Sequence, residues 1–444
     1  MKYLLLIPLV CVVWMGFGAD GTAPAWAERM LAELREPIIP AREFRITDFG
    51  AKADGSVSTA AFAAAFAAAE RTGGGRVVVP SGTWVTGKIH FRNNCELHFE
   101  DGAVLAFTDD PKDYLPSVPT SWEGVECYNY SPLLYGYGVT NVAITGRGLI
   151  RPKMDLWREW FNRPPAHMQA TETLYHWCST NAPVANRDVT KLEGANVRPH
   201  LIQFNRCKNV LLDGFAIKES PFWMIHLYLS DSCIVRNLKT DCHGHNNDGV
   251  DVEMTRNVLV EDCTFNQGDD GIVIKSGRNQ DAWRLDTPTE NVVVRNCNFE
   301  FAHVLLGIGS ELSGGARNIW MHDCTIGDCF NMFYIKTNRR RGGFVENIRG
   351  DRLTAGKVSK AGIGIETDVL YQWAKFPDYE VRRTSIRNIE LTESSCSEAG
   401  WAVRLCGDAH LPPENIRVDG LKVGKVAHDD VIENCRNVSV RLVK

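Results

Sequence analysis

Hydrophobic and polar residues alternate in a short unit that recurs along most of the chain. Each copy places an asparagine after a polar turn and follows it with alternating β-branched or aliphatic residues. The copies begin at Asn141, Asn209, Asn257, Asn291, Asn318, Asn388 and Asn437. The copies at Asn257, Asn291 and Asn318 are 34 and 27 residues apart, a period typical of solenoids, blades or arrays.

The repeated units are rich in strand-like segments and turn residues, with no helix between them. This excludes a solenoid of alternating strands and helices. The pattern predicts an all-β chain folded as a single-stranded right-handed parallel β-helix, with a propeller as the less favoured alternative. Coils of such a solenoid stack at about 4.8 Å, so that Val, Ile, Leu and Cys form one continuous core.

Two segments depart from the repeat. Residues 59–70 are almost entirely Ala and Phe, which predicts a helix, and the glycine triplet at 73–75 ends it. We interpret this helix as an N-terminal cap, because an uncovered sheet edge invites aggregation. Residues 152–199 are an insertion with a helix-like run at 165–179, packed against the groove or forming a flap without substrate contact.

The N-terminus has the composition of a secretory signal. Lys2 is followed by an apolar stretch that ends at Gly18. This stretch has about 16 residues, whereas a membrane span needs about 20. We therefore expect a signal peptide over residues 1–27, cleaved within 18–27, and one β-helix domain over 28–444. The mature protein is predicted to be secreted or periplasmic, with no membrane partner.

Charge and cysteine content narrow the function classes. The formal net charge is -5, without the basic excess that a nucleic-acid partner requires. Of 14 cysteines, one lies in the signal segment, and the odd remainder excludes a fully paired disulfide framework. No pair has the Cys-x-x-Cys spacing of a zinc site, so no metal is expected. Five cysteines share one position of the repeat, which indicates small buried core residues: Cys207, Cys233, Cys263, Cys297 and Cys324.

Two Asp-rich passages carry the candidate chemistry. The first contains Asn246 and Asp248, and the second contains the pair Asp269 and Asp270. Asp248 precedes the pair by 21 and 22 residues, about one coil, so the β-helix is expected to place all three carboxylates on one surface. Close carboxylates do not ionise equally, and one raised pKa provides an acid beside a base. Glycosidic cleavage requires these two groups, while turn formation and calcium binding are the alternatives.

Basic residues follow the acids. His303 lies 33 residues after Asp270 and 33 before Lys336, a spacing that is expected to align it with the carboxylates. Arg339 and the two arginines after it are either a solvated turn or a basic patch for a uronate carboxylate.

In this order the motifs resemble glycoside hydrolase family 28, the polygalacturonase family. The family has an Asn-x-Asp segment, an Asp-Asp pair, a Gly-His-Gly segment and an Arg-Ile-Lys segment. Here they correspond to residues 246–248, 269–270, 302–304 and 334–336. The resemblance extends from about residue 44 to the C-terminus, and includes the sequence DFGAKADG at 48–55.

The resemblance implies a role for each matching residue. Asp269 corresponds to the general acid, and Asp248 and Asp270 to the pair that holds and deprotonates water. His303 corresponds to the histidine that supports the acid, and Asn246 and Lys336 to substrate contacts. The implied reaction is hydrolysis of a galacturonate-containing pectic polysaccharide with inversion, by a monomer that needs no cofactor.

The sequence departs from the family pattern at three places. Ala302 and Val304 replace the two glycines, Asn247 stands where Thr is common, and Tyr334 replaces the arginine that would clamp a substrate carboxylate. Arg339 or one of the next two arginines is expected to compensate. The similarity to bacterial members with the insertion suggests exo action on galacturonate-containing pectin, with a branched rhamnogalacturonan as one candidate substrate. A calcium-dependent pectate lyase and a non-catalytic carbohydrate-binding β-helix are the alternatives.

Overall fold

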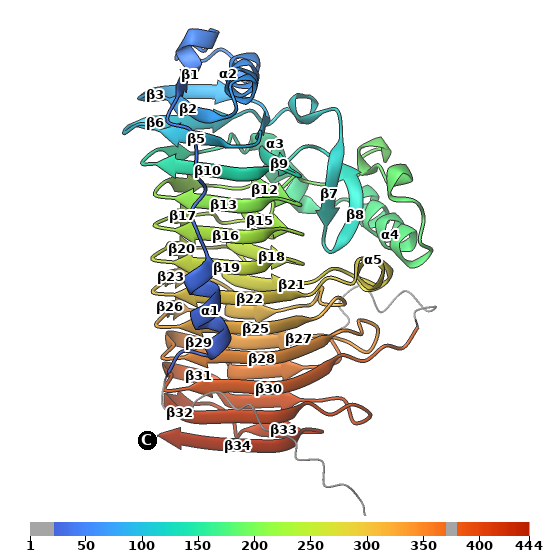
Figure 1. The fold of residues 1–444 in the computed structure, drawn as a ribbon. Helices are drawn as coiled ribbons and strands as arrows, with labels where there is room; N and C mark the ends of the chain where they lie inside the picture. The colour runs from blue at the N-terminus through green and yellow to red at the C-terminus, as the bar shows by residue number, and fades with distance from the viewer. Residues whose placement is uncertain (1–21, 370–379, 444) are drawn as a thin grey trace, which may run out of the picture.

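The protein is seen here as a computed structural model that describes residues 22–369 and 380–443. Its strands stack into one elongated solenoid, from the N-terminal coils at one end to the C-terminal coils at the other (Figure 1). The strands of this solenoid pair in parallel, coil upon coil. The predicted fold class is confirmed: the chain is an all-β, right-handed parallel β-helix.

Three ladders of strands run along the solenoid, and a typical coil adds one strand to each. The first ladder extends from the first strand of the chain to the last. Its strands are β1 (Glu43–Arg45), β2 (Gly75–Val79), β5 (Cys95–Phe99), β10 (Thr140–Gly146), β13 (Lys208–Asp213), β16 (Asp231–Arg236), β19 (Arg256–Glu261), β22 (Thr289–Arg295), β25 (Ala316–His322), β28 (Phe344–Asp351), β30 (Ser385–Thr392), β32 (Glu414–Val426) and β34 (Arg436–Val443).

The other two ladders share two long strands, β29 (Thr354–Glu366) and β31 (Ser395–Cys406). The second ladder also contains β3 (Gly82–Thr86), β6 (Ala103–Phe107), β11 (Leu149–Ile150), β14 (Ala216–Lys218), β17 (Lys239–Asp241), β20 (Thr264–Asn266), β23 (Asn298–Phe301) and β26 (Thr325–Asp328). The third also contains β4 (Ile89–His90), β9 (Leu134–Tyr137), β12 (Ile202–Asn205), β15 (Ile225–Tyr228), β18 (Val250–Glu253), β21 (Ile272–Lys275), β24 (Val304–Ile308), β27 (Asn331–Lys336) and β33 (Val431–Glu433).

The repeated asparagine has a left-handed backbone and links consecutive coils. Asn257, Asn291 and Asn318 have φ angles of 59°, 58° and 58°. Asn tolerates this region better than most residues with a side chain, because its short polar group bonds locally. The amide of Asn291 donates to Asn257 Oδ1 at 3.1 Å, and the amide of Asn318 donates to Asn291 Oδ1 at 3.0 Å. The ladder continues through Asn347 and Asn388, so it holds the coils in register.

The repeated cysteines are part of the core, as predicted. The five that share one position are at most 2% exposed, and their thiols are free. They pack among aliphatic and aromatic residues in one hydrophobic cluster that continues through most of the solenoid. A thiol fills a small space next to a turn, and burial raises the pKa of Cys233, which suppresses the reactivity of its thiol.

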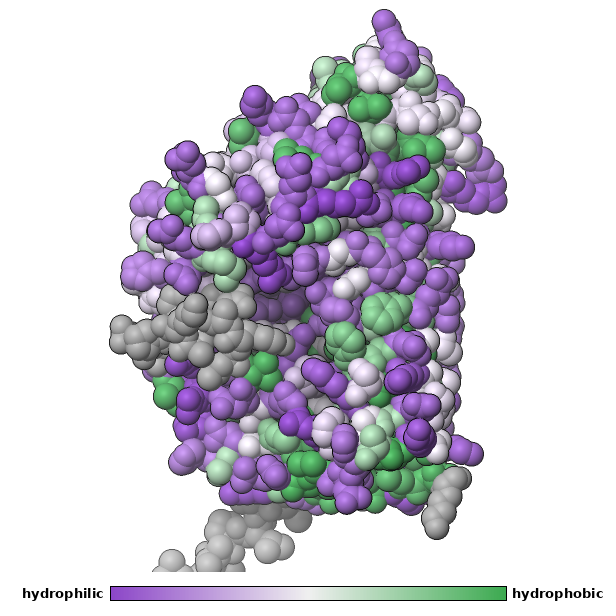
Figure 2. Space-filling view, turned by 180° about the vertical axis from the view of Figure 1, so that it is seen from behind, coloured by the Kyte–Doolittle hydropathy of each residue, from purple (hydrophilic) through white to green (hydrophobic). Residues whose placement is uncertain are grey.

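The two ends of the solenoid differ. Helix α2 (Thr59–Arg71) covers the N-terminal end, with Phe62 and Phe66 buried against the first coils, so the predicted cap is confirmed (Figure 1). The last coil leaves Val426, Ile432 and Leu442 exposed by 42%, 45% and 43%. Hydrophobic atoms are visible at this lower end in Figure 2.

Helix α1 (Ala25–Glu33) lies along the side of the solenoid. Ala27 and Met30 are buried in a cluster with Leu259, Val293 and Trp320. Most of the predicted signal peptide lies outside the described residues, and cleavage near the beginning of the predicted window leaves α1 whole. None of the helices in residues 22–369 and 380–443 is long and apolar enough to cross a membrane.

Helices and a hairpin cover one side of the upper coils (Figure 1). The antiparallel hairpin of β7 (Val118–Trp122) and β8 (Val125–Asn129) precedes the predicted insertion. The insertion itself contains α3 (Asp155–Glu159), α4 (Pro165–Ser179) and three short 3₁₀ turns, η3 (Trp160–Asn162), η4 (Val184–Asn186) and η5 (Val189–Lys191). The remaining elements are η1 (Ile46–Phe49), η2 (Pro111–Tyr114) and α5 (Asn279–Leu285). Helix α4 spans the predicted helix-like run and packs on the hairpin in a separate hydrophobic cluster.

The asparagine ladder leads to a stability prediction. Asn318→Ala should lower the free energy of unfolding by about 2 kcal/mol, because a left-handed non-glycine residue costs about 1–2 kcal/mol and an inter-coil hydrogen bond contributes about 1 kcal/mol. Asn318→Gly keeps the backbone angle accessible and should lose roughly half as much. Urea denaturation of both variants measures the difference, and equal losses would show that backbone strain is unimportant.

Candidate active site

A cavity of about 310 Å³ opens beside the third ladder, at the level of β18 to β27. Figure 2 shows a hollow at mid-height, with mostly hydrophilic side chains around it. Charged groups of both signs line the cavity. The acidic residues are Glu123, Asp248, Asp269, Asp270 and Glu311, and the basic residues are Arg163, Lys275, Lys336 and Lys360. The predicted residues Asn246 and His303 also line it.

Stacked turns bring the three aspartates together. Val250 pairs with Ile272, so the turn that holds Asp248 lies against the turn that holds Asp269 and Asp270. The N–H of Gly249 donates to the carbonyl of Asp270 at 2.9 Å. The coil register therefore confirms the expected neighbourhood of residues 22 positions apart.

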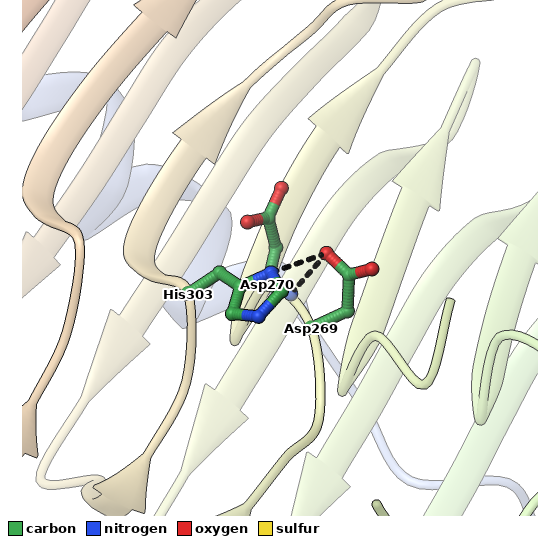
Figure 3. Close-up of side chains that lie close together, drawn as sticks. All are labelled: Asp269, Asp270 and His303. Atoms are coloured by element: carbon green, nitrogen blue, oxygen red, sulfur yellow. Dashed lines mark hydrogen bonds and ion pairs between the residues drawn. The ribbon is translucent and has the colours of Figure 1, made fainter. Parts of the chain in front are cut away.

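His303 comes from the corresponding turn of the next coil. Its N–H donates to the carbonyl of Asp269 at 2.7 Å, and its Nδ1 lies 3.2 Å from Asp269 Oδ1. The N–H of Asp270 donates to the same oxygen at 3.0 Å, so both contacts meet at one carboxylate atom (Figure 3). The imidazole stacks on Phe330 with the ring centres 4.4 Å apart, which fixes its orientation.

The contact with His303 controls the protonation of Asp269. Burial would raise the pKa of this carboxyl group, but the hydrogen bond and charge of His303, together with Lys336 and Lys275, lower it. The pKa of His303 rises in return, chiefly through the hydrogen bond to Asp269. The contact between the two side chains therefore favours an ionised Asp269 beside a protonated His303.

Asp248 has the opposite tendency. It is 3% exposed, and burial together with the charges of Asp251 and Asp269 raises its pKa well above the ordinary value. Its Oδ1 has no hydrogen-bond partner in the part of the chain that the structure describes. The two carboxyl groups are therefore unequal, as expected, because their surroundings shift the pKa of Asp248 upward and that of Asp269 downward.

Asp270 forms a close ion pair with Lys336, whose Nζ lies 2.6 Å from Asp270 Oδ2. His303 and Lys336 lie at different positions of their coils, because Val304 pairs with Asn331 and the partner of His303 is therefore Phe330. Lys336 lies at the far end of β27. The alignment of His303 with the carboxylates, which its spacing predicted, is present in its contact with Asp269.

The sequence reasoning missed two charged residues beneath the aspartates. Lys275, at the end of β21, is 5% exposed, and its ammonium lies 3.1 Å from Glu311 and 3.8 Å from Asp251. It also lies 4.6 Å from the centre of the Trp223 ring. The available signal in the sequence was a lysine at the end of the apolar strand that follows the Asp-Asp pair. The pKa of Glu311 is lowered despite burial, because Lys275 and Arg278 stabilise its charge.

The predicted contact residue Asn246 is held by two arginines. Its Oδ1 accepts from Arg163 at 2.8 Å and from Arg198 at 3.0 Å. Arg198 is fully buried, and desolvation and the charge of Arg163 lower its pKa to about 9. Neither arginine was identified from the sequence, because each comes from the segment outside the repeat.

The three consecutive arginines have different surroundings, and the compensation expected from one of them stays a prediction. Arg339 is exposed and does not line the cavity. Arg341 is buried behind the cavity, where its Nε donates to the carbonyl of Ser310 at 2.8 Å. Tyr334 stands at the family position and donates its hydroxyl to Glu366 at 2.8 Å.

The hairpin closes the N-terminal side of the cavity. Thr120 donates to Gln203 Oε1 at 3.0 Å and Ser121 donates to Glu253 Oε2 at 3.2 Å, so β7 covers the outward face of the third ladder. Glu123, at the tip of the hairpin, lines the cavity and accepts a short hydrogen bond from Tyr175 of α4. The hairpin and the predicted insertion therefore both border the cavity: the hairpin contributes Glu123, and the insertion contributes Arg163 and supports the hairpin through Tyr175.

Asp269, Asp270 and His303 have possible metal-ligand atoms within 4.8 Å of one another. Their donor types suit a divalent cation. However, Lys336 already contacts Asp270 and the pKa of His303 is raised, which favours a cationic ring. These positive charges oppose a metal ion, so the residues do not fit a resident cation.

Comparison with known proteins identifies the family. The sequence model of glycosyl hydrolases family 28 matches residues 180–443, more than half of the chain. This chain belongs to that family. A solved structure of a hyperthermoactive exopolygalacturonase from Thermotoga maritima superposes with a TM-score of 0.88, at 34% identity over 94% of this chain and 95% of that one.

Other family 28 relatives are more distant. A probable polygalacturonase from Vitis vinifera is 26% identical over 72% of this chain, and an exo-poly-alpha-D-galacturonosidase from Dickeya chrysanthemi is 25% identical over 62%. The matched regions cover 62% and 48% of these two curated relatives, so this chain spans only part of their length.

The pair of Asp269 and His303 leads to a pH-dependent prediction. His303 has a raised pKa, so its stabilising effect is complete below its ordinary value of 6.5 and is lost as the pH rises through the folded value. Asp269 has a lowered pKa, so the stability that it contributes is complete above pH 3.8 and is lost as the pH falls through the folded pKa. His303→Gln should therefore destabilise the protein most near pH 5, by about 0.5–1 kcal/mol because both side chains are partly exposed.

Urea midpoints between pH 4 and pH 8 measure this effect. His243→Gln is the control, because His243 is half exposed and lies 3.7 Å from Asp241 outside the cavity. A deficit of His303→Gln that stays constant with pH would contradict the charged pair.

Proposed function

We propose that the protein hydrolyses a galacturonate-containing pectic polysaccharide. The observation that carries this proposal is the cavity at which the stacked turns bring Asp248, Asp269 and Asp270 together, with His303 in contact with Asp269. Glycoside hydrolysis requires a protonated and an ionised carboxyl group on the two sides of the scissile bond. Membership of family 28 and the similarity to a solved exopolygalacturonase support the same reaction.

In the proposed mechanism Asp269 donates its proton to the leaving glycosidic oxygen. A water molecule held by Asp248 and Asp270 attacks the anomeric carbon from the opposite face and gives a proton to this pair. The glycosidic C–O bond breaks as the new C–O bond forms, and the configuration inverts. His303 positions Asp269, and Asn246 and Lys336 contact the sugar next to the acids.

In the free protein the two pKa shifts run opposite to these roles, since the pKa of Asp269 is lowered and that of Asp248 is raised. A bound uronate adds a negative charge and excludes water, and both effects raise the pKa of Asp269. Once Asp269 is neutral, it no longer raises the pKa of Asp248, which then gives up its proton. The aspartates titrate as one coupled group, and the substrate itself brings the acid into its protonated form.

The cations explain why the substrate is acidic. Arg163, Lys275, Lys336 and Lys360 all line the cavity, and although Lys275 and Lys336 are paired with Glu311 and Asp270, the group offers a uronate carboxylate positive charge within reach. Ion pairs to a carboxylate are stronger than neutral hydrogen bonds in a partly closed cavity. Which galacturonate-containing pectin is preferred, plain or branched with rhamnose, follows from the assay below.

We further propose exo action, because the hairpin covers the N-terminal side of the cavity. A polymer that crosses the site needs a groove open at both ends, whereas a closed end accepts only a chain terminus. The pectic substrate lies outside the cell, which accords with the expected signal peptide and with a secreted or periplasmic enzyme. A monomer suffices, since one chain supplies the whole site.

The two alternatives are less well supported. A calcium-dependent lyase needs carboxylates available to a cation, whereas Asp270 is paired with Lys336 and Asp269 with His303. A non-catalytic binding protein has no need for a buried carboxyl with an unpartnered oxygen such as Asp248. Hydrolysis uses all of these features.

The first test is activity. The purified protein should release reducing ends from homogalacturonan or rhamnogalacturonan without unsaturated product, with or without a chelator. Asp269→Asn should reduce kcat about 10²–10⁴-fold, the usual contribution of a general acid. Asp241→Asn, a half-exposed residue outside the cavity, should retain wild-type activity. Chelator-sensitive unsaturated product would support the lyase instead.

A second test follows the products. NMR recorded during the reaction should show inverted anomers first, and chromatography should show one small product from the beginning, with a slow fall in viscosity. Exo cleavage removes only terminal units, so the long chains persist. Early release of a mixed ladder of oligomers would contradict the closed end.

A further inference from the structure

The groove continues beyond the catalytic cavity, toward the C-terminal coils. A second cavity of about 380 Å³ lies beside β29 and β31, and shares Asn331, Tyr334 and Lys360 with the first. Its other side chains include Glu366, Trp401 and Arg404. If the N-terminal side is closed by the hairpin, this is the direction in which the rest of a polymer must leave.

Two glycines at equivalent positions of the third ladder leave the space that forms both cavities. On the outward face of the third ladder, Gly307 pairs with Tyr334, Tyr334 with Gly364, and Gly364 with Arg404. A Cβ atom at Gly307 would lie 3.6 Å from Asp270 Oδ2, and one at Gly364 would lie 3.1 Å from the ring of Tyr334. The missing side chains leave space on both sides of Tyr334, which separates the cavities.

The spacing suits consecutive sugars of one chain. Gly307 and Gly364 are two coils apart, which is about 10 Å at the usual separation of parallel strands. This is a distance that a disaccharide spans. A chain with its scissile bond over the first glycine therefore extends over the second without bending.

The second cavity has a net positive charge. Glu366 is paired with Arg404 and also accepts from Tyr334, so the acid is already neutralised. The ammonium of Lys360 has no ion pair or hydrogen bond with any residue in the described ranges, although it borders both cavities. A carboxylate that enters here gains an ion pair without displacing an existing partner of Lys360.

Trp401 adds an apolar surface next to these charges. Its ring lies 5.4 Å from the Arg404 guanidinium and 4.6 Å from the ring of His428, and these contacts hold it at the side of the cavity. A flat aromatic ring beside a cation is suited to a uronate, which has both an apolar ring face and a charged group.

We propose that Lys360, Trp401 and Arg404 form a second binding site for a uronate residue, on the open side of the catalytic cavity. Lys360 supplies the carboxylate contact that the arginine at the position of Tyr334 supplies in the family pattern. The inference rests on the proposed function, and it adds a specificity for chain length and for free carboxylates. A disaccharide occupies the first cavity, and a third sugar reaches the second.

The test compares digalacturonate with trigalacturonate. Trp401→Leu should raise KM for the trimer about tenfold, the usual effect of losing one aromatic contact, with little change for the dimer or in kcat. Lys360→Met should raise KM for both substrates, and more for the trimer, because Lys360 borders both cavities. Trp401→Phe should restore part of the loss. Lys360→Met should also abolish the preference for free trimer over its methyl ester.

Lys357→Met is the matched control, because Lys357 is an exposed lysine on the same strand that does not line either cavity. Equal losses on dimer and trimer, or no loss on either, would overturn the second site while leaving the hydrolase intact. A wild-type protein inactive on every pectin would refute the proposed function. In that case calorimetry of Asp269→Asn with dimer and trimer, with and without Lys360→Met, still decides whether the second site exists.

Discussion

The register between parallel coils is the constraint on which the rest of the structure depends. Backbone hydrogen bonds join each coil to the next, and the side chains of the asparagine ladder repeat this link at one turn of the solenoid. A slip of one residue would send inward side chains outward along an entire strand. The same register stacks the turns of Asp248, Asp270 and Val304, so the geometry of the cavity follows from the core that stabilises the fold.

The stacked turns bring three carboxyl groups close together, and the residues around each group reduce the repulsion between them. Three carboxyl groups lie in two successive turns, and each has a different environment: Asp248 is buried with one oxygen unpartnered, Asp269 contacts an imidazole, and Asp270 contacts an ammonium. The pKa values of Asp248 and Asp269 shift in opposite directions for this reason, although the residue type is the same. In the proposed reaction, an anionic substrate changes this balance further and couples recognition of a uronate to the protonation state needed for its cleavage.

The segments outside the repeat decide which substrates reach this chemistry. The hairpin closes the N-terminal side, and α4 supports it through the contact of Tyr175 with Glu123. On the other side, Gly307 and Gly364 keep the outward face of the third ladder open around Tyr334. One coil architecture can thus serve different pectins by changes in a hairpin and in a few outward side chains, without any change in the core.

The sequence by itself determined the solenoid, its cap, its cysteine core and the neighbourhood of the aspartates. These features are local or periodic: an asparagine that favours a left-handed turn, an Ala-rich helix, and residues one coil apart that must stack. Only the tertiary structure decided the position of Lys336, the burial of Arg341, the exposure of Arg339 and the closure by the hairpin. Coil lengths vary from turn to turn, and segments outside the repeat have no period. Their contacts depend on which surface they meet, and that surface exists only once the coils have stacked.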